Sequence, residues 1–446
     1  MHADTRTQRR TSWVQALGAL GNRNFRLYWL GMLVSSLGTR LQMLALTWLV
    51  LDLTSSGLAL GAMVMAEAAP ILLLSLFGGA LADRLPRRPV LLFTQAAMLV
   101  QALVLGILVS MGAIELWLIY VLSAAAGTIE ALDTPTSQAF IGELVGPDKD
   151  DLCNASELWT TLFNATKVAG PVLAGLLVAA IGEMACFYLN AASFLAVIAA
   201  LLLVDEQRMY PLAAPPREAI IRQVKSGVTY TLGTADIAMI VLLLAALGLF
   251  GYNLGVLLPL IARSLLASGP MGLGLLSAAL GAGSLVGSLV VDYTGMNARL
   301  HVLAGAVVFT LVFFSLSLFV GWLLLVTLTI ALGFGSVLFL ATANARLQLL
   351  TSDDFRGRVM GVYTLLLYGT APLGGLLAGA LAERIGVRRT VALLAGLCGV
   401  GVLATLAYLR WRRDRLLPEP ESDQLVRTEE ELVHRLRLHQ HLFRLH

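Results

Sequence analysis

Long runs of apolar residues, separated by short polar turns, repeat along almost the whole chain. A membrane-spanning helix needs about 20 apolar residues, and each run is about this long. The runs do not alternate apolar and polar positions, so they are typical of helices and not of barrel strands. The pattern predicts an all-α polytopic membrane protein with twelve transmembrane helices. The runs lie near 25–51, 57–82, 89–111, 114–138, 156–181, 184–204, 235–262, 270–292, 299–320, 322–349, 357–382 and 387–410.

One long interruption divides the runs into two sets of six. It contains Pro211, Pro215 and Pro216, followed by apolar residues at helical spacing with basic residues between them. We expect a linker whose amphipathic helix lies on the inner membrane surface. The predicted domains are a cytoplasmic N-terminal segment at 1–24, a six-helix half at 25–204, the linker at 205–234, a second six-helix half at 235–410 and a cytoplasmic tail at 411–446.

The two halves share short patterns in the same order. The residues from Gly78 to Asp83 parallel those from Gly287 to Asp292, and the Gly-Pro pair at Gly170 parallels the Ala-Pro pair at Ala371. Such repeats predict two pseudo-symmetric halves with a substrate site between them near the middle of the membrane.

Composition supports a chain that is mostly solvated by lipid. The 446 residues are 58% hydrophobic and 13% charged, whereas soluble domains carry about 25% charged residues. The net charge of +3 gives no reason to expect a nucleic-acid partner. The three cysteines are far apart, and neither a phosphate-binding loop nor an HExxH motif is present. We therefore expect no metal, no cofactor and no enzymatic activity.

Basic residues set the expected orientation. With both termini placed in the cytoplasm, 25 of the 31 Lys and Arg residues fall on the inner side, as the positive-inside rule requires. This predicts a multi-pass protein of the bacterial cytoplasmic (inner) membrane. The local exception is the cluster from Arg384 to Arg389.

Three of the ionisable residues inside the apolar runs are candidates for function. Glu67, in the second run, is either the proton-coupling residue or a structural carboxylate paired with a base such as Arg40. Arg40 and Lys167 are the embedded bases, which neutralise Glu67, bind an anionic cargo, or extend toward the headgroups. Embedded amides either bind cargo or bond another helix; they complete the predicted cavity and are Gln42, Asn164, Asn190, Asn253 and Asn344.

A charged turn follows the second run. It comprises Gly79, Asp83, Arg84, Arg87 and Arg88, and it must lie in water because intramembrane charge is costly. Small residues and prolines in later runs predict kinks and close helix packing. These are Gly170, Pro171, Gly175 and Pro372.

Several of these motifs resemble the major facilitator superfamily, in particular the branch with the enterobactin exporter and related drug and macrolide efflux proteins. The resemblance lies in the Gly79–Arg88 turn, in Asp133-Thr134-Pro135, in Lys167 to Pro171 and in Asp353 to Gly361. It implies that the turn latches one transport state, with Glu130 and Asp133 as partners; simple topology anchoring is the alternative. The chain departs from the family pattern at Lys167, where we expect Arg, and at Glu67, where we expect a neutral polar residue.

The resemblance implies secondary active transport by alternating access. We expect a monomer, working in the lipid bilayer, that exports amphipathic small-molecule substrates such as siderophores, macrolides or other drugs in exchange for protons. A lipid or lysolipid transporter of the same fold is one alternative. A non-transporting scaffold or sensor is another, although it would have no use for costly intramembrane charge.

Overall fold

A computed structural model of the chain describes residues 18–82, 85–210, 231, 233–295, 298–318 and 321–415. For 75–82, 292, 353–354 and 413–415 it describes the backbone alone. The contacts divide the chain into Met1–Val402 and Leu403–His446. The predicted amphipathic helix and most of the predicted tail lie outside the described residues, so these two predictions remain untested.

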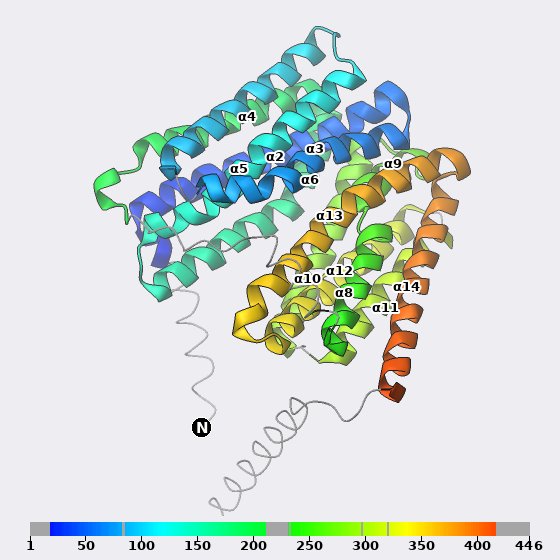
Figure 1. Ribbon diagram of the computed structural model, residues 1–446. Helices are drawn as coiled ribbons and strands as arrows, with labels where there is room; N and C mark the ends of the chain where they lie inside the picture. The colour runs from blue at the N-terminus through cyan, green and yellow to red at the C-terminus, as the bar shows by residue number, and fades with distance from the viewer. Residues whose placement is uncertain are drawn as a thin grey trace, which may run out of the picture. The chain divides into compact units, whose positions relative to one another are not determined.

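The described residues are almost entirely helical (Figure 1). The first half contains η1 (Gly18–Gly21), α2 (Arg23–Thr54), α3 (Gly57–Ala82), α4 (Arg87–Ser110), α5 (Leu116–Val145), α6 (Lys149–Leu203) and η2 (Glu206–Arg208). The second half contains α8 (Ala235–Phe250), α9 (Leu254–Ser264), α10 (Pro270–Thr294), α11 (Arg299–Leu318), α12 (Trp322–Leu350), α13 (Asp353–Ile385) and α14 (Val387–Arg415).

The predicted number of membrane crossings is confirmed. Eleven helical segments of the described chain are long and apolar enough to cross a membrane, with α8 and α9 counted together. One of them, α6, has 55 residues, and at about 1.5 Å per residue it is far longer than a bilayer core. Gly182 adopts a φ of 81° and breaks α6 in two. The helix therefore supplies two crossings, which brings the total to twelve.

The crossing predicted near 235–262 is confirmed, and it contains a break between α8 and α9. The backbone amides of Gly251 and Tyr252 both donate to the carbonyl of Leu247 at 2.7 and 2.8 Å, which ends α8. The buried amide of Asn253 donates to the carbonyls of Phe250 and Gly374. Because these polar groups are satisfied inside the protein, the broken backbone is tolerated at membrane depth.

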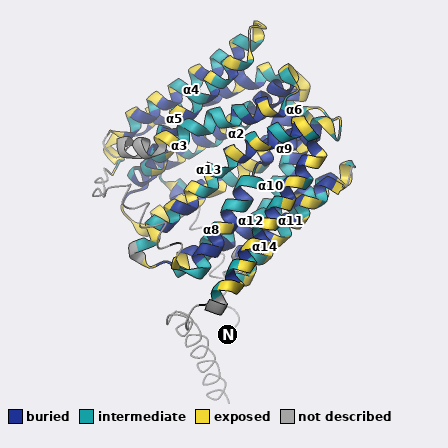
Figure 2. Cartoon of the chain, turned by 45° about the vertical axis from the view of Figure 1, so that its right-hand side comes forward, coloured by how far each residue is buried: buried dark blue, intermediate teal, exposed yellow. Residues whose placement is uncertain are grey.

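Two ends of the helices can be distinguished. We call the end where α2 gives way to α3, α9 to α10 and α13 to α14 the seam end, and the end near η1 and η2 the linker end. Within Met1–Val402, α3 packs on α13 and α6 packs on α10 (Figure 1). These two contacts join the halves, and buried residues gather on the faces where helices meet (Figure 2).

Glycines bring the two halves into backbone contact toward the seam end. A methyl group placed on Gly61 would lie 2.7 Å from the carbonyl oxygen of Gly375, and one on Gly175 would lie 2.9 Å from the Cα of Gly274. A methyl group on Gly379 would overlap the backbone of Gly57. We call these glycine contacts the seam. Near the linker end of α13, in contrast, methyl groups on Gly357 and Gly361 would meet nothing within 4 Å. Glycine contacts thus close the halves on each other at the seam end, whereas Gly357 and Gly361 at the linker end of α13 make no such contact.

Arginine side chains close the ends of two helices in the same way. Arg88 at the start of α4 donates to the carbonyls of Leu201 and Leu202 at the end of α6, at 2.7 and 3.2 Å. Arg388 at the start of α14 donates to the carbonyls of Ser317 and Leu318 at the end of α11, at 2.6 and 2.7 Å. The last carbonyls of a helix lack partners and attract cations. Arg388, part of the exception to the charge asymmetry, therefore has a structural role.

Candidate functional site

Four charged side chains from four different helices come together inside the first half. They are Arg40 on α2, Glu67 on α3, Glu130 on α5 and Lys167 on α6, and we call them the charged cluster. Arg40 interacts electrostatically with both acids and with Lys167. The second half contributes no such group, since its helices carry no Asp, Glu, Lys or Arg between 237–262, 271–291, 300–345 and 359–382.

Arg40 has few partners for its guanidinium. A methyl group on Gly170 would lie 2.6 Å from the Cβ of Arg40, so this glycine makes room for the arginine stem against α6. The Nη1 group points at the sulfur of Met43 at 4.0 Å, and the buried Nε has no hydrogen-bond partner among the described residues. Neither acid of the cluster lies within 4.0 Å of it as an ion pair in the described structure.

The two acids and Lys167 differ in their surroundings. Glu67 is half-buried, and Gly127 on α5 packs directly against its backbone carbonyl. The side chains of Glu130 and Lys167 are exposed. The cluster thus has two acids on α3 and α5, and two bases on α2 and α6.

Asp133, one helical turn from Glu130, belongs to a separate network. Its Oδ1 accepts hydrogen bonds from the hydroxyl of Thr94 at 2.5 Å and from the amide of Gln95 at 2.9 Å. Its Oδ2 accepts from Ser137 at 3.4 Å, and Ser137 in turn accepts from the hydroxyl of Tyr28. These bonds join α2, α4 and α5 at the linker end.

The predicted gate residues are described in part. Asp83 and Arg84 lie outside the described residues, and Gly79 is described by its backbone in α3. Arg87 is buried and forms an ion pair with Glu143 at 2.8 Å, and Arg88 forms one with Glu206. In this conformation both arginines therefore bind acids of their own half other than the expected Glu130 and Asp133.

The embedded amides are used in different ways. Asn190, which is buried, donates to Gln42 at 2.8 Å, and Gln42 donates to Gln101 at 3.0 Å. For these two the structure shows bonds between helices. Asn344 accepts from Gln348 on its own helix, and Asn164 is half-buried on α6. The bonds of Asn253 hold the break between α8 and α9.

Two of the predicted packing residues, Pro171 and Gly175, lie where the halves meet, whereas Gly170 packs against Arg40 within the first half. Pro171 and Gly175 of α6 contact Gly274 of α10, since a methyl group on Gly274 would lie 2.6 Å from the carbonyl oxygen of Pro171. Pro372 is buried in α13, which packs on α3. Their positions fit the predicted role in close packing.

Polar contacts between the halves at the seam end were not predicted. Arg263 on α9 forms an ion pair with Asp52 on α2 at 2.5 Å and also donates to Ser55. Glu383 on α13 accepts from the hydroxyl of Ser56 and from the backbone amide of Leu58, at the start of α3. Single charged residues in otherwise apolar turns are the signal that would have indicated these contacts.

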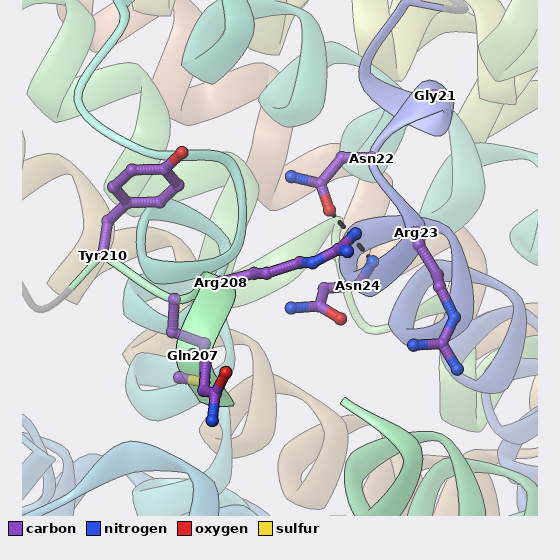
Figure 3. Close-up of a pocket in the computed structure, with 8 residues that line it drawn as sticks. Gly21, Asn22, Arg23, Asn24, Gln207, Arg208 and Tyr210 are labelled. Atoms are coloured by element: carbon purple, nitrogen blue, oxygen red, sulfur yellow. Dashed lines mark hydrogen bonds between the residues drawn. The ribbon is translucent and has the colours of Figure 1, made fainter. Parts of the chain in front are cut away.

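A surface pocket of about 410 Å³ lies at the linker end. It is lined by Gly21, Asn22, Arg23, Asn24, Gln207, Arg208, Met209 and Tyr210 (Figure 3). The amide of Asn24 is paired with the backbone of Asp205 in both directions, and Asn22 caps α2 and donates to Leu144. These bonds fasten the start of α2 to the end of the first half. None of the residues that line the pocket belongs to the charged cluster.

Comparison with known proteins places the chain among transporters. Residues 14–436 match a family described as transmembrane secretion effectors. The multidrug efflux pump Tap of Mycolicibacterium fortuitum is 27% identical over 383 residues, which are 83% of this chain and 92% of that protein. The staphyloferrin A transporter of Staphylococcus aureus is 26% identical over 370 residues, 80% of this chain and 89% of that one.

Solved structures share the fold at low sequence identity. A bacterial homolog of the human lysosomal transporter Spinster, inward-facing and unoccupied, matches with a TM-score of 0.68 and 12% identity, over 89% of this chain and 99% of that one. The POT family transporter PepTSo matches with a TM-score of 0.70 and 13% identity, over the same shares of the two chains. At these identities the structures show the fold alone.

Proposed function

Since the chain belongs to the transmembrane secretion effector family of the major facilitator superfamily, we propose that it exports amphipathic small molecules in exchange for protons. It is a multi-pass membrane transporter of small molecules and not an enzyme. The names of two relatives, a multidrug efflux pump and a staphyloferrin A transporter, support drugs or siderophores as cargo.

The charged cluster is the observation that carries the proposal. Charged side chains at membrane depth are costly and are found on ion or substrate pathways. Glu67 is half-buried, near a second acid and near a base that forms no ion pair with it. Such a carboxyl group can exist with or without its proton as its surroundings change. We assign proton coupling to Glu67, and cargo contact to Arg40, Glu130 and Lys167.

The distribution of basic residues supports an orientation for the chain. We place the linker end, where these residues concentrate, and both termini in the cytoplasm of a bacterium, with the chain acting as a monomer in the inner membrane. The seam end then faces outward, and the described conformation is inward-facing. Alternating access requires the seam to open while contacts form at the linker end. The turn from Gly79 to Arg88 would latch that second state on Glu130 and Asp133.

Transport in vesicles tests the proposal. Protein would be reconstituted in liposomes that contain a pH-sensitive dye, and siderophores, macrolides and lysolipids would be added in turn. We expect one cargo class to drive proton flux, and Glu67→Gln to reduce that flux at least tenfold. Glu115→Gln, in the exposed turn before α5, is the matched control and should behave as the parent.

Two outcomes would contradict the proposal. Equal cargo-driven proton flux in Glu67→Gln and the parent would remove Glu67 from coupling. Movement of cargo or lysolipid in the parent without proton flux would indicate uniport or lipid transport.

A further inference from the structure

We propose that the cargo carries a zwitterionic headgroup, whose oxyanion binds Arg40 and Lys167 and whose ammonium group binds Glu67 and Glu130. This inference rests on the proposed function, because it assigns cargo chemistry to the same site. It commits to one class of ligand: amphipathic molecules with an amino-acid-like polar end.

The guanidinium of Arg40 lacks a partner that matches it. A guanidinium has five N–H donors arranged to bind a carboxylate through two parallel bonds. Here one donor points at a thioether sulfur and the buried Nε has no partner among the described residues. A buried donor without an acceptor costs free energy. The missing acceptor is supplied by an oxyanion of the cargo.

Lys167 lies where a second cation would help to hold that oxyanion. It is exposed on α6, three residues before the Gly170 that makes room for the stem of Arg40. The two bases are close enough to interact electrostatically. Like charges repel, so an anion that interacts with both relieves the repulsion. If the two acids served only to neutralise the bases, Arg40 and Lys167 would each form an ion pair with an acid. The described structure contains no ion pair for either base.

The acids on α3 and α5 form the complementary half of the site. Glu67 and Glu130 interact electrostatically with each other, and two carboxylates that share a site hold a cation or a proton readily. An ammonium group on the cargo competes with the proton for the same oxygens. The cargo therefore binds when the acids have released a proton, and it leaves when they take one up from outside, which is the order that exchange requires.

The rest of the cargo meets a neutral wall. The charged groups at the depth of the cluster come from the first half. Asp133, one turn nearer the linker end, is occupied by Thr94, Gln95 and Ser137. The helices of the second half are free of Asp, Glu, Lys and Arg over the same depth. A molecule with one zwitterionic end and one apolar end fits this asymmetry.

A matched set of four fluorescent probes tests the headgroup. Nε-dansyl-lysine is zwitterionic, its methyl ester is cationic, its Nα-acetyl derivative is anionic, and its Nα-acetyl methyl ester is neutral. The four differ only in whether the α-amino and α-carboxyl groups are free or blocked. Binding to the purified full-length protein is followed by dansyl fluorescence. We expect the zwitterion to bind about tenfold more tightly than the cationic and the anionic probe, which each lose one charged contact, and more tightly still than the neutral probe, which loses both.

Variants assign each charge. Arg40→Gln should weaken the two probes with a free carboxylate and leave the methyl ester unchanged, and Glu67→Gln should weaken the two probes with a free ammonium. Arg389→Gln and Glu115→Gln, both exposed near the seam end, are controls. Equal weakening of all four probes by Arg40→Gln, equal binding of zwitterion and methyl ester, or no binding of any probe overturns the headgroup assignment.

Proton release separates this inference from the proposed function. In weak buffer, binding of the zwitterion should release protons from the parent and none from Glu67→Gln. The expected probe preferences without proton release would refute proton coupling and leave the headgroup assignment standing. Proton release with equal binding of all four probes would refute the headgroup assignment and leave proton coupling standing.

Discussion

Gly127 and Gly170 determine how closely the charged side chains of the first half approach one another. Gly127 lets α5 contact the backbone carbonyl of Glu67, and Gly170 leaves room for the stem of Arg40 beside α6. A side chain at either position would push a helix away from its neighbour and would change the distances within the charged cluster. The geometry of the cluster therefore depends on residues that carry no charge.

Replacing Gly127 by alanine tests this dependence. The added methyl group would overlap the carbonyl of Glu67, and because backbone cannot move aside cheaply, we expect a loss of about 1–3 kcal/mol in stability. Thermal unfolding in detergent measures it. Gly361→Ala is the control, because its methyl group would face open space. Identical melting temperatures for the two variants would contradict the prediction.

The sequence located part of this site. Charge within apolar runs is conspicuous, so Arg40, Glu67 and Lys167 could be singled out directly. Gly127 could not, because an isolated glycine in a membrane helix does not reveal which neighbour it contacts. For the same reason the sequence could not show that Gln42 and Asn190 bond each other.

At the scale of helices, the ends are held by side chains from other helices. Arg88 at the start of α4 and Arg388 at the start of α14 lie at opposite ends of the helices, and each binds the last carbonyls of a neighbouring helix. The length of the apolar runs predicted most helices well, because the thickness of the bilayer sets the length of a membrane-spanning helix. It missed the break between α8 and α9, because both sides of the break are equally apolar and the Asn253 bonds that permit it are tertiary contacts.

Arg388→Ala should destabilise the end of α11. Two hydrogen bonds from a charged donor are lost, and we expect a cost of about 1–3 kcal/mol. Hydrogen exchange at the end of α11 measures the effect locally, and Arg389→Ala, its exposed neighbour, is the control. Equal exchange in both variants would show that the carbonyls are satisfied without Arg388.

At the scale of the whole transporter, polar contacts and the seam close the same end. Asp52 with Arg263, and Glu383 with the start of α3, join the halves beside the glycine contacts. The duplicated halves were predictable from repeated motifs, whereas the described conformation was not, because both transport states use one sequence.

Arg263→Ala should shift the protein away from the closed seam. An exposed ion pair contributes up to about 1 kcal/mol, so we expect up to about a fivefold change in the ratio of the two states. Electron-spin distances between labels at Met111 and Arg389, one in each half near the seam end, report the shift. Arg384→Ala, the control, removes an exposed arginine nearby and should leave the label distances unchanged. Unchanged label distances in Arg263→Ala as well would exclude a gating role for the Asp52–Arg263 ion pair.

The seam also has an electrical consequence. Where backbone touches backbone between Gly61 and Gly375, and between Gly175 and Gly274, no water fits, while the linker end, which we propose to face the cytoplasm, would admit the conducting solution. The membrane voltage therefore falls mainly across this thin dry layer, where each elementary charge gains or loses about 2.3 kcal/mol per 100 mV. A zwitterion has no net charge and crosses this layer at no electrical cost, whereas a proton that crosses it gains or loses this energy. Under the proposed exchange, the voltage of the cell and its pH difference would both drive export.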